Sequence, residues 1–221
     1  MTELRHEYPG VVLADGGSSY GGNQGLSPDK VMRRCGCGVV AAADLLRYLH
    51  RWHRPLPMLD EVAETPTQEA YEELLQTLRR RAFPLFYPVG LNGLALALGL
   101  NLLFIKNGVP LRARWDVSEK KLWTRMEEML LRDMPVILSI GPNFPRLWKQ
   151  GKETLYRMDQ GDYRRAAETR AHYVTVTGMD ESWLRISSWG KEYYLSRDEY
   201  EQFRADISSA LVSNIVYIRR K

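Results

Sequence analysis

The stretch that decides the fold is Cys37-Gly38-Val39-Val40-Ala41-Ala42-Ala43, a cysteine followed at once by an apolar run. Leu45 and Leu46 continue the apolar stripe at helical spacing, and Pro55 stops it, so we expect a helix over 37–52. The cysteine therefore stands in the first helical turn, where the backbone N–H groups have no partner within the helix.

A cysteine in this position is a candidate nucleophile. The partial positive charge of a helix N-terminus favours a thiolate over a thiol, and Arg33 and Arg34 lie just upstream. A free cysteine has a pKa of about 8.5, and we expect the pKa of Cys37 to be lower. The alternative is that Cys37 is only a small buried residue, because free cysteines are among the most buried residue types.

A second informative stretch, His172-Tyr173-Val174-Thr175-Val176-Thr177-Gly178, predicts a strand led by a histidine, and residues 183–190 predict the returning strand. A register that aligns the apolar faces of the two strands pairs Val176 with Leu184. The same register places His172 opposite Ser188, which would then orient the imidazole. The alternative is a histidine that only satisfies a backbone group at the end of a strand.

Together the two stretches resemble papain-like cysteine peptidases, and more closely the bacteriocin-processing branch that cleaves after paired glycines. In that branch a helix opens with Cys-Gly-x-x-Ala, as Cys37 to Ala41 does, and a histidine leads an apolar strand that ends at glycine, as His172 to Gly178 does. The family's Asn or Asp, about sixteen residues after the histidine, falls on Ser188. The papain wording Asn-Ser-Trp-Gly instead aligns with Ser187-Ser188-Trp189-Gly190 and puts Ser187 in that place. Either alignment leaves a serine at the orienting position.

The resemblance implies a cysteine-dependent hydrolase, a peptidase or amidase, that acts on a peptide or amide substrate without a cofactor. Cys37 would attack the carbonyl, His172 would carry the proton, and Ser188 or Ser187 would orient the ring. Two alternatives stay open. One is an acyl transferase on the same Cys-His dyad, and the other is a catalytically inactive binding scaffold, which the missing Asn or Asp favours.

Gln24 is the candidate for the family's oxyanion-binding glutamine, because it is the one glutamine before Cys37. It lies thirteen positions upstream, about twice the usual separation in the family, so an extended glycine-rich loop must carry it back to the nucleophile. The alternative is a polar surface turn built on Gly22 and Asn23.

Other side chains compete for roles in this site. Cys35 and Gly36 form a second Cys-Gly pair. If the family's helix pattern is aligned from Cys35 instead of Cys37, Ala41 falls out of phase with it. We therefore expect Cys35 to be a resolving thiol or an inert neighbour. Asp180 would lie about 26 Å from His172 along an extended strand and is too distant to act as its carboxylate. The carboxylates that remain open as partners of the histidine are Asp162, Glu168, Asp198 and Glu199.

We expect no metal site and no nucleic-acid partner. His50 and His53 would lie about 20 Å from Cys37 at the far end of the predicted helix, too far to share one zinc ion with it. The net charge is +4, but the arginines fall in short clusters rather than in a continuous basic stripe or a known nucleic-acid-binding module.

The chain also predicts no membrane partner and a cytoplasmic location. No apolar run approaches eighteen residues, and the first residues lack the basic-then-apolar pattern of a signal peptide. Nothing in the sequence indicates an oligomeric state or a physiological partner.

The 221 residues, 44% of them hydrophobic, suit a single domain over 1–221, in which helices come first and strands last, an α+β order. The resemblance implies a papain-like two-lobe fold, with a helical lobe at about 1–134 whose nucleophile helix packs on an antiparallel sheet at about 135–221.

We also predict helices over Thr67–Ala82 and around 90–99, a strand at Leu102–Ile105, and a helix over Ser118–Arg132 capped by Ser118. An aromatic insertion, Gly141–Arg170, would overhang the cleft.

Overall fold

The computed structural model describes residues 1–118 and 120–220. The helices are α1 (Lys30–Cys35), α2 (Cys37–Trp52), α3 (Gln68–Arg81), α4 (Gly93–Lys106), α5 (Leu122–Leu131) and α6 (Arg197–Asp206), with short 3-10 turns η1 (Gln24–Leu26) and η2 (Pro57–Leu59). The strands are β1 (Thr2–Glu3), β2 (Leu111–Trp115), β3 (Val136–Ile140), β4 (Glu153–Asp159), β5 (Asp162–Thr169), β6 (His172–Met179), β7 (Trp183–Ser188), β8 (Lys191–Ser196) and β9 (Ile215–Arg220).

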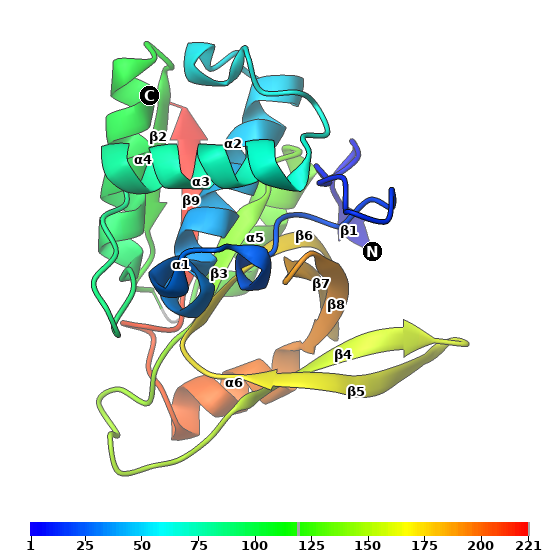
Figure 1. The fold of residues 1–221 in the computed structure, drawn as a ribbon. Coiled ribbons are helices and arrows are strands. Elements are labelled where there is room, and N and C mark those ends of the chain that lie inside the picture. The colour runs from blue at the N-terminus through cyan, green and yellow to red at the C-terminus, as the bar shows by residue number, and fades with distance from the viewer. Residues whose placement is uncertain (119, 221) are drawn as a thin grey trace.

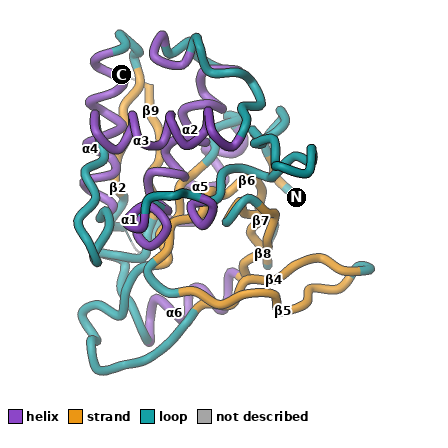
Figure 2. Tube along the Cα trace, in the orientation of Figure 1, coloured by secondary structure: helices purple, strands orange, loops and turns teal. Residues whose placement is uncertain are grey.

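The strands form one antiparallel sheet in the order β2-β9-β3-β6-β7-β8-β4-β5, and β1 pairs with β6. The sheet curves strongly from one end to the other. In Figure 1, β3 and β9 run upright, whereas β4 and β5 lie almost across the view. The predicted α+β class, with mixed helices and antiparallel strands, is confirmed (Figure 2). Most helices precede most strands along the chain.

Helix α2 is the central element, because its apolar side chains pack across β6 and β3 while α3 crosses in front of it (Figure 1). Its predicted bounds, 37–52, are those observed. Helix α3 also begins and ends close to where its sequence predicts, with the Thr67 side chain accepting a hydrogen bond from the Ala70 N–H as its N-cap. Helix α5 packs against β9, β3, β6 and β1, and α6 against β4 and β8.

One predicted strand, near α4, and one predicted helix cap, at α5, are wrong. Leu102–Ile105 does not form a strand but continues α4, which Asn92 caps and which is apolar on all sides. Ser118 does not cap α5, which begins at Leu122 after Lys121 without a side-chain cap. The Ser118 N–H instead donates to Asp116 Oδ1. The predicted α5 range includes residue 119, which lies outside the described residues.

The register of the β6–β7 hairpin differs from the predicted one by two residues. Val176 pairs with Ile186 rather than with Leu184, which pairs with Met179. The strand continues past Gly178, and a bulge at Thr177 absorbs the extra residue. The turn then forms at Asp180, whose side chain accepts hydrogen bonds from two backbone N–H groups of the loop.

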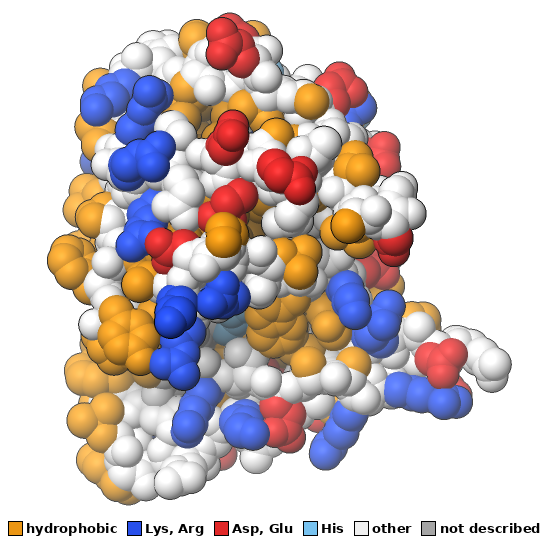
Figure 3. Space-filling model, viewed as in Figure 1, with side chains coloured by type: hydrophobic (Ala, Val, Ile, Leu, Met, Phe, Trp, Pro, Cys, Tyr) orange, Lys and Arg blue, Asp and Glu red, His pale blue; other side chains and the backbone are white. Residues whose placement is uncertain are grey.

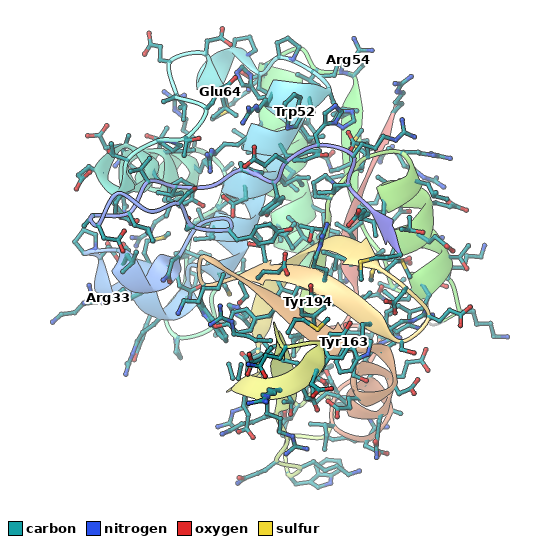
Figure 4. The ribbon with its side chains drawn as sticks, turned by 90° about the vertical axis from the view of Figure 1, so that its right-hand side faces the viewer. Arg33, Trp52, Arg54, Glu64, Tyr163 and Tyr194 are labelled. Atoms are coloured by element: carbon teal, nitrogen blue, oxygen red, sulfur yellow. The ribbon has the colours of Figure 1, made fainter. Side chains whose placement is uncertain are left out.

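The predicted insertion, Gly141–Arg170, contains the β4–β5 hairpin. Tyr163 of β5 stacks on Trp183 of β7 with ring centroids 3.9 Å apart. It also meets Tyr194 of β8 edge to face, with centroids 5.1 Å apart, and Figure 4 shows these two tyrosines close together on the sheet. These aromatic contacts hold the hairpin against the curved end of the sheet.

Candidate functional site

Cys37 is the first residue of α2, where the chain turns sharply between two helices. Gly36 ends α1 and begins α2, and a side chain there would collide with Met32. Cys37 is a free cysteine that remains partly exposed, and the next residue, Gly38, packs against Tyr173 and Leu91. Each residue of the Cys-Gly pair therefore has a structural role. The thiol faces the pocket described below, and the glycine lets β6 approach the helix closely.

His172 is the first residue of β6 and is buried, with 6% of its surface exposed. Its Nε2 atom lies 2.8 Å from Ser188 Oγ at the end of β7. The ring of Trp189 stacks on the imidazole, with centroids 4.5 Å apart and planes 19° apart. The ring nitrogen that remains free of Ser188 is Nδ1.

The Trp189 ring reaches the histidine because of the turn that carries it. Trp189 and Gly190 both have positive φ angles, 48° and 73°, and Ser188 pairs with Lys191 across them. This is the pattern of a two-residue type I′ hairpin, in which a tryptophan is unusual. In the sequence Trp189 stands out only as part of a motif, whereas in the structure its ring forms one wall of the site.

One small pocket brings all five predicted site residues together. Cys37, His172, Ser187, Ser188 and Gln24 line it, together with Asp44, Trp189 and backbone of the glycine-rich loop. The Tyr173 N–H, next to His172 in the chain, lies by the Cys37 sulfur. Four segments that are far apart in the sequence therefore meet around the thiol. The enclosed volume is about 10 Å³, room for about one water molecule.

The two candidate serines have different contacts. Ser188 Oγ meets the imidazole, as described above, whereas Ser187 Oγ donates a 2.7 Å hydrogen bond to the Tyr20 carbonyl. Ser188 lies diagonally from His172 in the ladder rather than opposite it, because the register differs from the predicted one. The expected contact forms through this diagonal geometry, and Ser187 anchors the glycine-rich loop instead.

Gln24 begins η1 and is 9% exposed, so it is not part of a free surface turn. The Asn23 side chain caps that turn by accepting from the Gly25 N–H. Gln24 Nε2 donates one hydrogen bond, 3.1 Å long, to the Arg33 carbonyl. The amide group has a second N–H, and Gln24 lines the same pocket as Cys37.

Asp44 is a site residue that the sequence analysis missed. It is 2% exposed, and it accepts hydrogen bonds from the Gly22 N–H at 2.8 Å and the Tyr71 hydroxyl at 2.9 Å. Arg47 lies 3.5 Å from the same carboxylate. The signal was present, because Asp44 interrupts an apolar helix seven residues after Cys37, two turns along the same face. Asp44 holds the loop that leads to Gln24.

Burial shifts the two reactive groups away from an ion pair. It raises the pKa of the Cys37 thiol, although the N–H groups of Tyr173 and Gly38 lower it in part. Burial also lowers the pKa of His172 to about 4. The expectation of a lowered thiol pKa is therefore wrong, because loss of contact with water outweighs the helix N-terminus.

The upstream arginines do not face the thiol. Arg33 donates to the carbonyls of Ser27 and Pro28, and Figure 4 shows its side chain at the outer edge of the molecule. Arg34 donates to the Tyr87 hydroxyl. Their proximity to Cys37 in the sequence does not bring their charge to the sulfur.

The remaining candidates lie elsewhere. Cys35 donates weakly to the Pro88 carbonyl and does not line the pocket. Among the described residues, none of the four carboxylates left open contacts His172. Glu168 pairs with Lys152, Glu199 accepts a hydrogen bond from Tyr156, and neither Asp162 nor Asp198 lines the pocket. Residues 141–170 likewise contribute nothing to the wall of this pocket.

His50 and His53 have structural partners at the end of α2. His50 Nδ1 accepts from the Leu56 N–H, and His53 lies 3.1 Å from the Asp133 carboxylate. Within residues 1–118 and 120–220, no three His, Cys, Asp or Glu side chains gather as they would around a metal ion. No helix in the same part of the chain is both long and apolar enough to cross a membrane.

Comparisons with protein-family models, with curated proteins and with solved structures find no match to this chain.

Proposed function

We propose that the protein is a cysteine-dependent hydrolase that acts on a peptide or amide through Cys37 and His172, on a papain-like two-lobe scaffold. One observation carries the proposal: a cysteine at a helix N-terminus, a strand-leading histidine, its hydroxyl partner and a buried glutamine line a single pocket. This is the set of groups that acyl transfer to a thiol requires.

In the proposed reaction, Ser188 accepts the Nε2–H of His172, so Nδ1 is left unprotonated and can act as the base. The Cys37 sulfur attacks the substrate carbonyl carbon while its proton passes to Nδ1. The resulting oxyanion accepts hydrogen bonds from the second N–H of Gln24 and from the Cys37 backbone N–H. The imidazolium then protonates the leaving amine, and water hydrolyses the thioester.

The pKa directions favour a dyad that is neutral at rest. A raised thiol pKa and a lowered imidazole pKa both disfavour a thiolate-imidazolium pair. Proton transfer would then accompany the attack rather than precede it. The pocket admits little more than the reacting carbonyl group, so the rest of the substrate would lie across its mouth.

The second candidate is a binding scaffold that has lost catalysis. Two observations favour it: no carboxylate among the described residues supports His172, and burial works against a reactive thiolate. An acyl transferase remains a variant of the first proposal, because it would use the same thioester and differ only in the acceptor.

Acetylation by p-nitrophenyl acetate tests the proposal. We expect a burst of nitrophenolate and an acetyl group on Cys37, detected by mass spectrometry. Cys37→Ser should abolish the burst, and His172→Ala should slow it by about a hundredfold through loss of the base. Cys35→Ser is the matched control and should retain the burst. A folded wild-type protein whose Cys37 is not acetylated, or is acetylated equally fast in His172→Ala, would support the binding scaffold.

A further inference from the structure

One side of the molecule carries an uncovered apolar helix face. Leu94, Leu98, Leu102 and Ile105 recur at helical spacing along α4, and between 39% and 65% of each side chain is exposed. The opposite side of α4 packs on β2 and α2. Four large aliphatic side chains on one exposed helix face are more than scattered surface hydrophobics, and such patches mark interaction sites.

Two loops extend the same apolar surface. The loop before α4 exposes Phe86, Tyr87 and Val89, and the loop after β3 exposes Leu147 and Trp148, each by more than half of its surface. In Figure 1, α4 and both loops lie along the left border of the molecule. We call these side chains of α4 and the two loops the apolar face.

The sequence segments that carry the apolar face contain basic residues and no acidic ones, although Arg79 and Lys152 pair with Asp29 and Glu168 from outside these segments. Residues 79–115, which include α4 and the loop before it, contain six Lys or Arg and no Asp or Glu. Residues 134–152, which include the other loop, contain three Lys or Arg and again no acid. The whole chain has 27 acidic residues among 221, about one in eight, so these gaps are unusual. Orange and blue atoms predominate along the left border of Figure 3.

The geometry makes other occupants less suitable. A second copy of this chain would bring two basic surfaces together, and like charges repel. An added β-strand could not pair with β2, because the Asn101 side chain bonds both to the Ala113 N–H and to its carbonyl and so closes that edge. The pockets described in residues 1–118 and 120–220 are not lined by the apolar face, which offers no groove to a peptide helix.

We propose that the apolar face binds the surface of a lipid bilayer that contains anionic lipids. The leucines of α4 and the aromatic loop side chains would lie at the boundary between headgroups and acyl chains, where Trp and Tyr are favoured. The flanking Lys and Arg side chains would meet the lipid phosphates. Binding of this kind needs no spanning helix, so the prediction of no membrane partner, which rested on the absence of a spanning segment, does not address it.

Sedimentation with vesicles tests this proposal on the full chain. The vesicles consist either of phosphatidylcholine alone or of phosphatidylcholine mixed with phosphatidylserine. We expect binding to the mixed vesicles that weakens as salt is added. Leu98→Ser with Trp148→Ser removes apolar anchors, and Arg80→Ser with Arg81→Ser removes two charges. Each double variant should weaken binding by about tenfold or more. Near-ultraviolet circular dichroism checks that each variant folds.

Met158→Ser is the matched control, because Met158 is 45% exposed but lies near the tip of the β4–β5 hairpin, on the right of Figure 1. It should bind as the wild type does. The proposal is overturned if the folded wild type does not bind mixed vesicles at low salt, or if both double variants bind as well as Met158→Ser. Retention on an immobilised acidic amphipathic peptide without vesicle binding would assign the face to a protein partner and also overturn it.

Discussion

His172 should make the protein less stable in mild acid, by an amount that follows from its burial. An imidazole has a pKa of about 6.5 in an unfolded chain, and burial lowers it to about 4 in the folded protein. Between these two values the unfolded chain binds a proton that the folded protein does not. The free energy of unfolding therefore rises with pH in this window, and the contribution is lost as the pH falls from 6.5 toward 4.

The magnitude follows from the two pKa values. The whole difference corresponds to about 3 kcal/mol of stability. Between pH 7 and pH 5 the unfolded imidazole becomes almost fully protonated while the folded one stays mostly neutral. The expected loss over that interval is about 2 kcal/mol. This is a large part of the stability of an ordinary domain.

The assay is urea denaturation of the wild type and of His172→Gln at pH 7, 6 and 5. Glutamine keeps a polar group near Ser188 but does not titrate. Every other titrating group is common to both proteins, so its contribution cancels in the difference between their free energies of unfolding. The stability advantage of the wild type over the variant should shrink by about 2 kcal/mol from pH 7 to pH 5. A difference that stays constant within about 0.5 kcal/mol would show that burial does not lower the pKa of His172. It would mean that the imidazole meets water or a carboxylate.

Three further predictions concern single side chains. Burial raises the pKa of Glu153 to about 8, so the folded protein retains a proton that the unfolded chain releases, and stability falls as the pH rises through this range. Glu153→Gln should remove this loss, about 3 kcal/mol between pH 5 and pH 8 in urea denaturation. Asp44→Ala should cost about 3 to 5 kcal/mol by leaving buried donors without an acceptor, whereas Asp60→Ala, at a carboxylate that is 61% exposed, should stay within about 0.5 kcal/mol of the wild type. Ser188→Asp should raise the pKa of His172 by about 1 to 3, followed by NMR titration, because a carboxylate would replace the hydroxyl beside Nε2; an unchanged titration would show that the new side chain turns away.

The elements that the sequence predicts correctly are those with local signals. The bounds of α2 follow from an apolar run between Cys37 and Pro55, and α3 follows from the Thr67 cap and its helical periodicity. The β6–β7 hairpin is likewise visible as two apolar strands around a polar turn. In each case the residues that determine the element lie within the element or directly beside it.

The errors come from longer-range packing. Leu102–Ile105 has the composition of a strand, but it is buried on one side as the last turns of α4. The β6–β7 register depends on a bulge at Thr177, which the pattern of apolar residues does not show.

The residues of the candidate site also differ in how clearly the sequence reveals them. Cys37, His172 and Ser188 could be chosen from motifs, whereas the sequence marks Asp44 only as an acidic residue in an apolar helix. Its contact with the Gly22 N–H, across 22 positions of sequence, is seen only in the structure. The electrostatics could not be predicted either. A helix N-terminus and two nearby arginines favour a thiolate, but the fold turns the arginines away, and burial raises the pKa of the Cys37 thiol.

The burial of the site explains why position 188 holds a serine rather than a carboxylate. A carboxylate beside His172 would be buried almost completely, because Ser188 is only 5% exposed, and burying an ion is costly unless its partner is charged as well. The imidazole is itself held neutral by burial. A hydroxyl orients a neutral imidazole through one hydrogen bond without adding a charge to desolvate. If the protein acts as we propose, its dyad therefore starts neutral, and the hydroxyl contributes orientation rather than stabilisation of an ion pair.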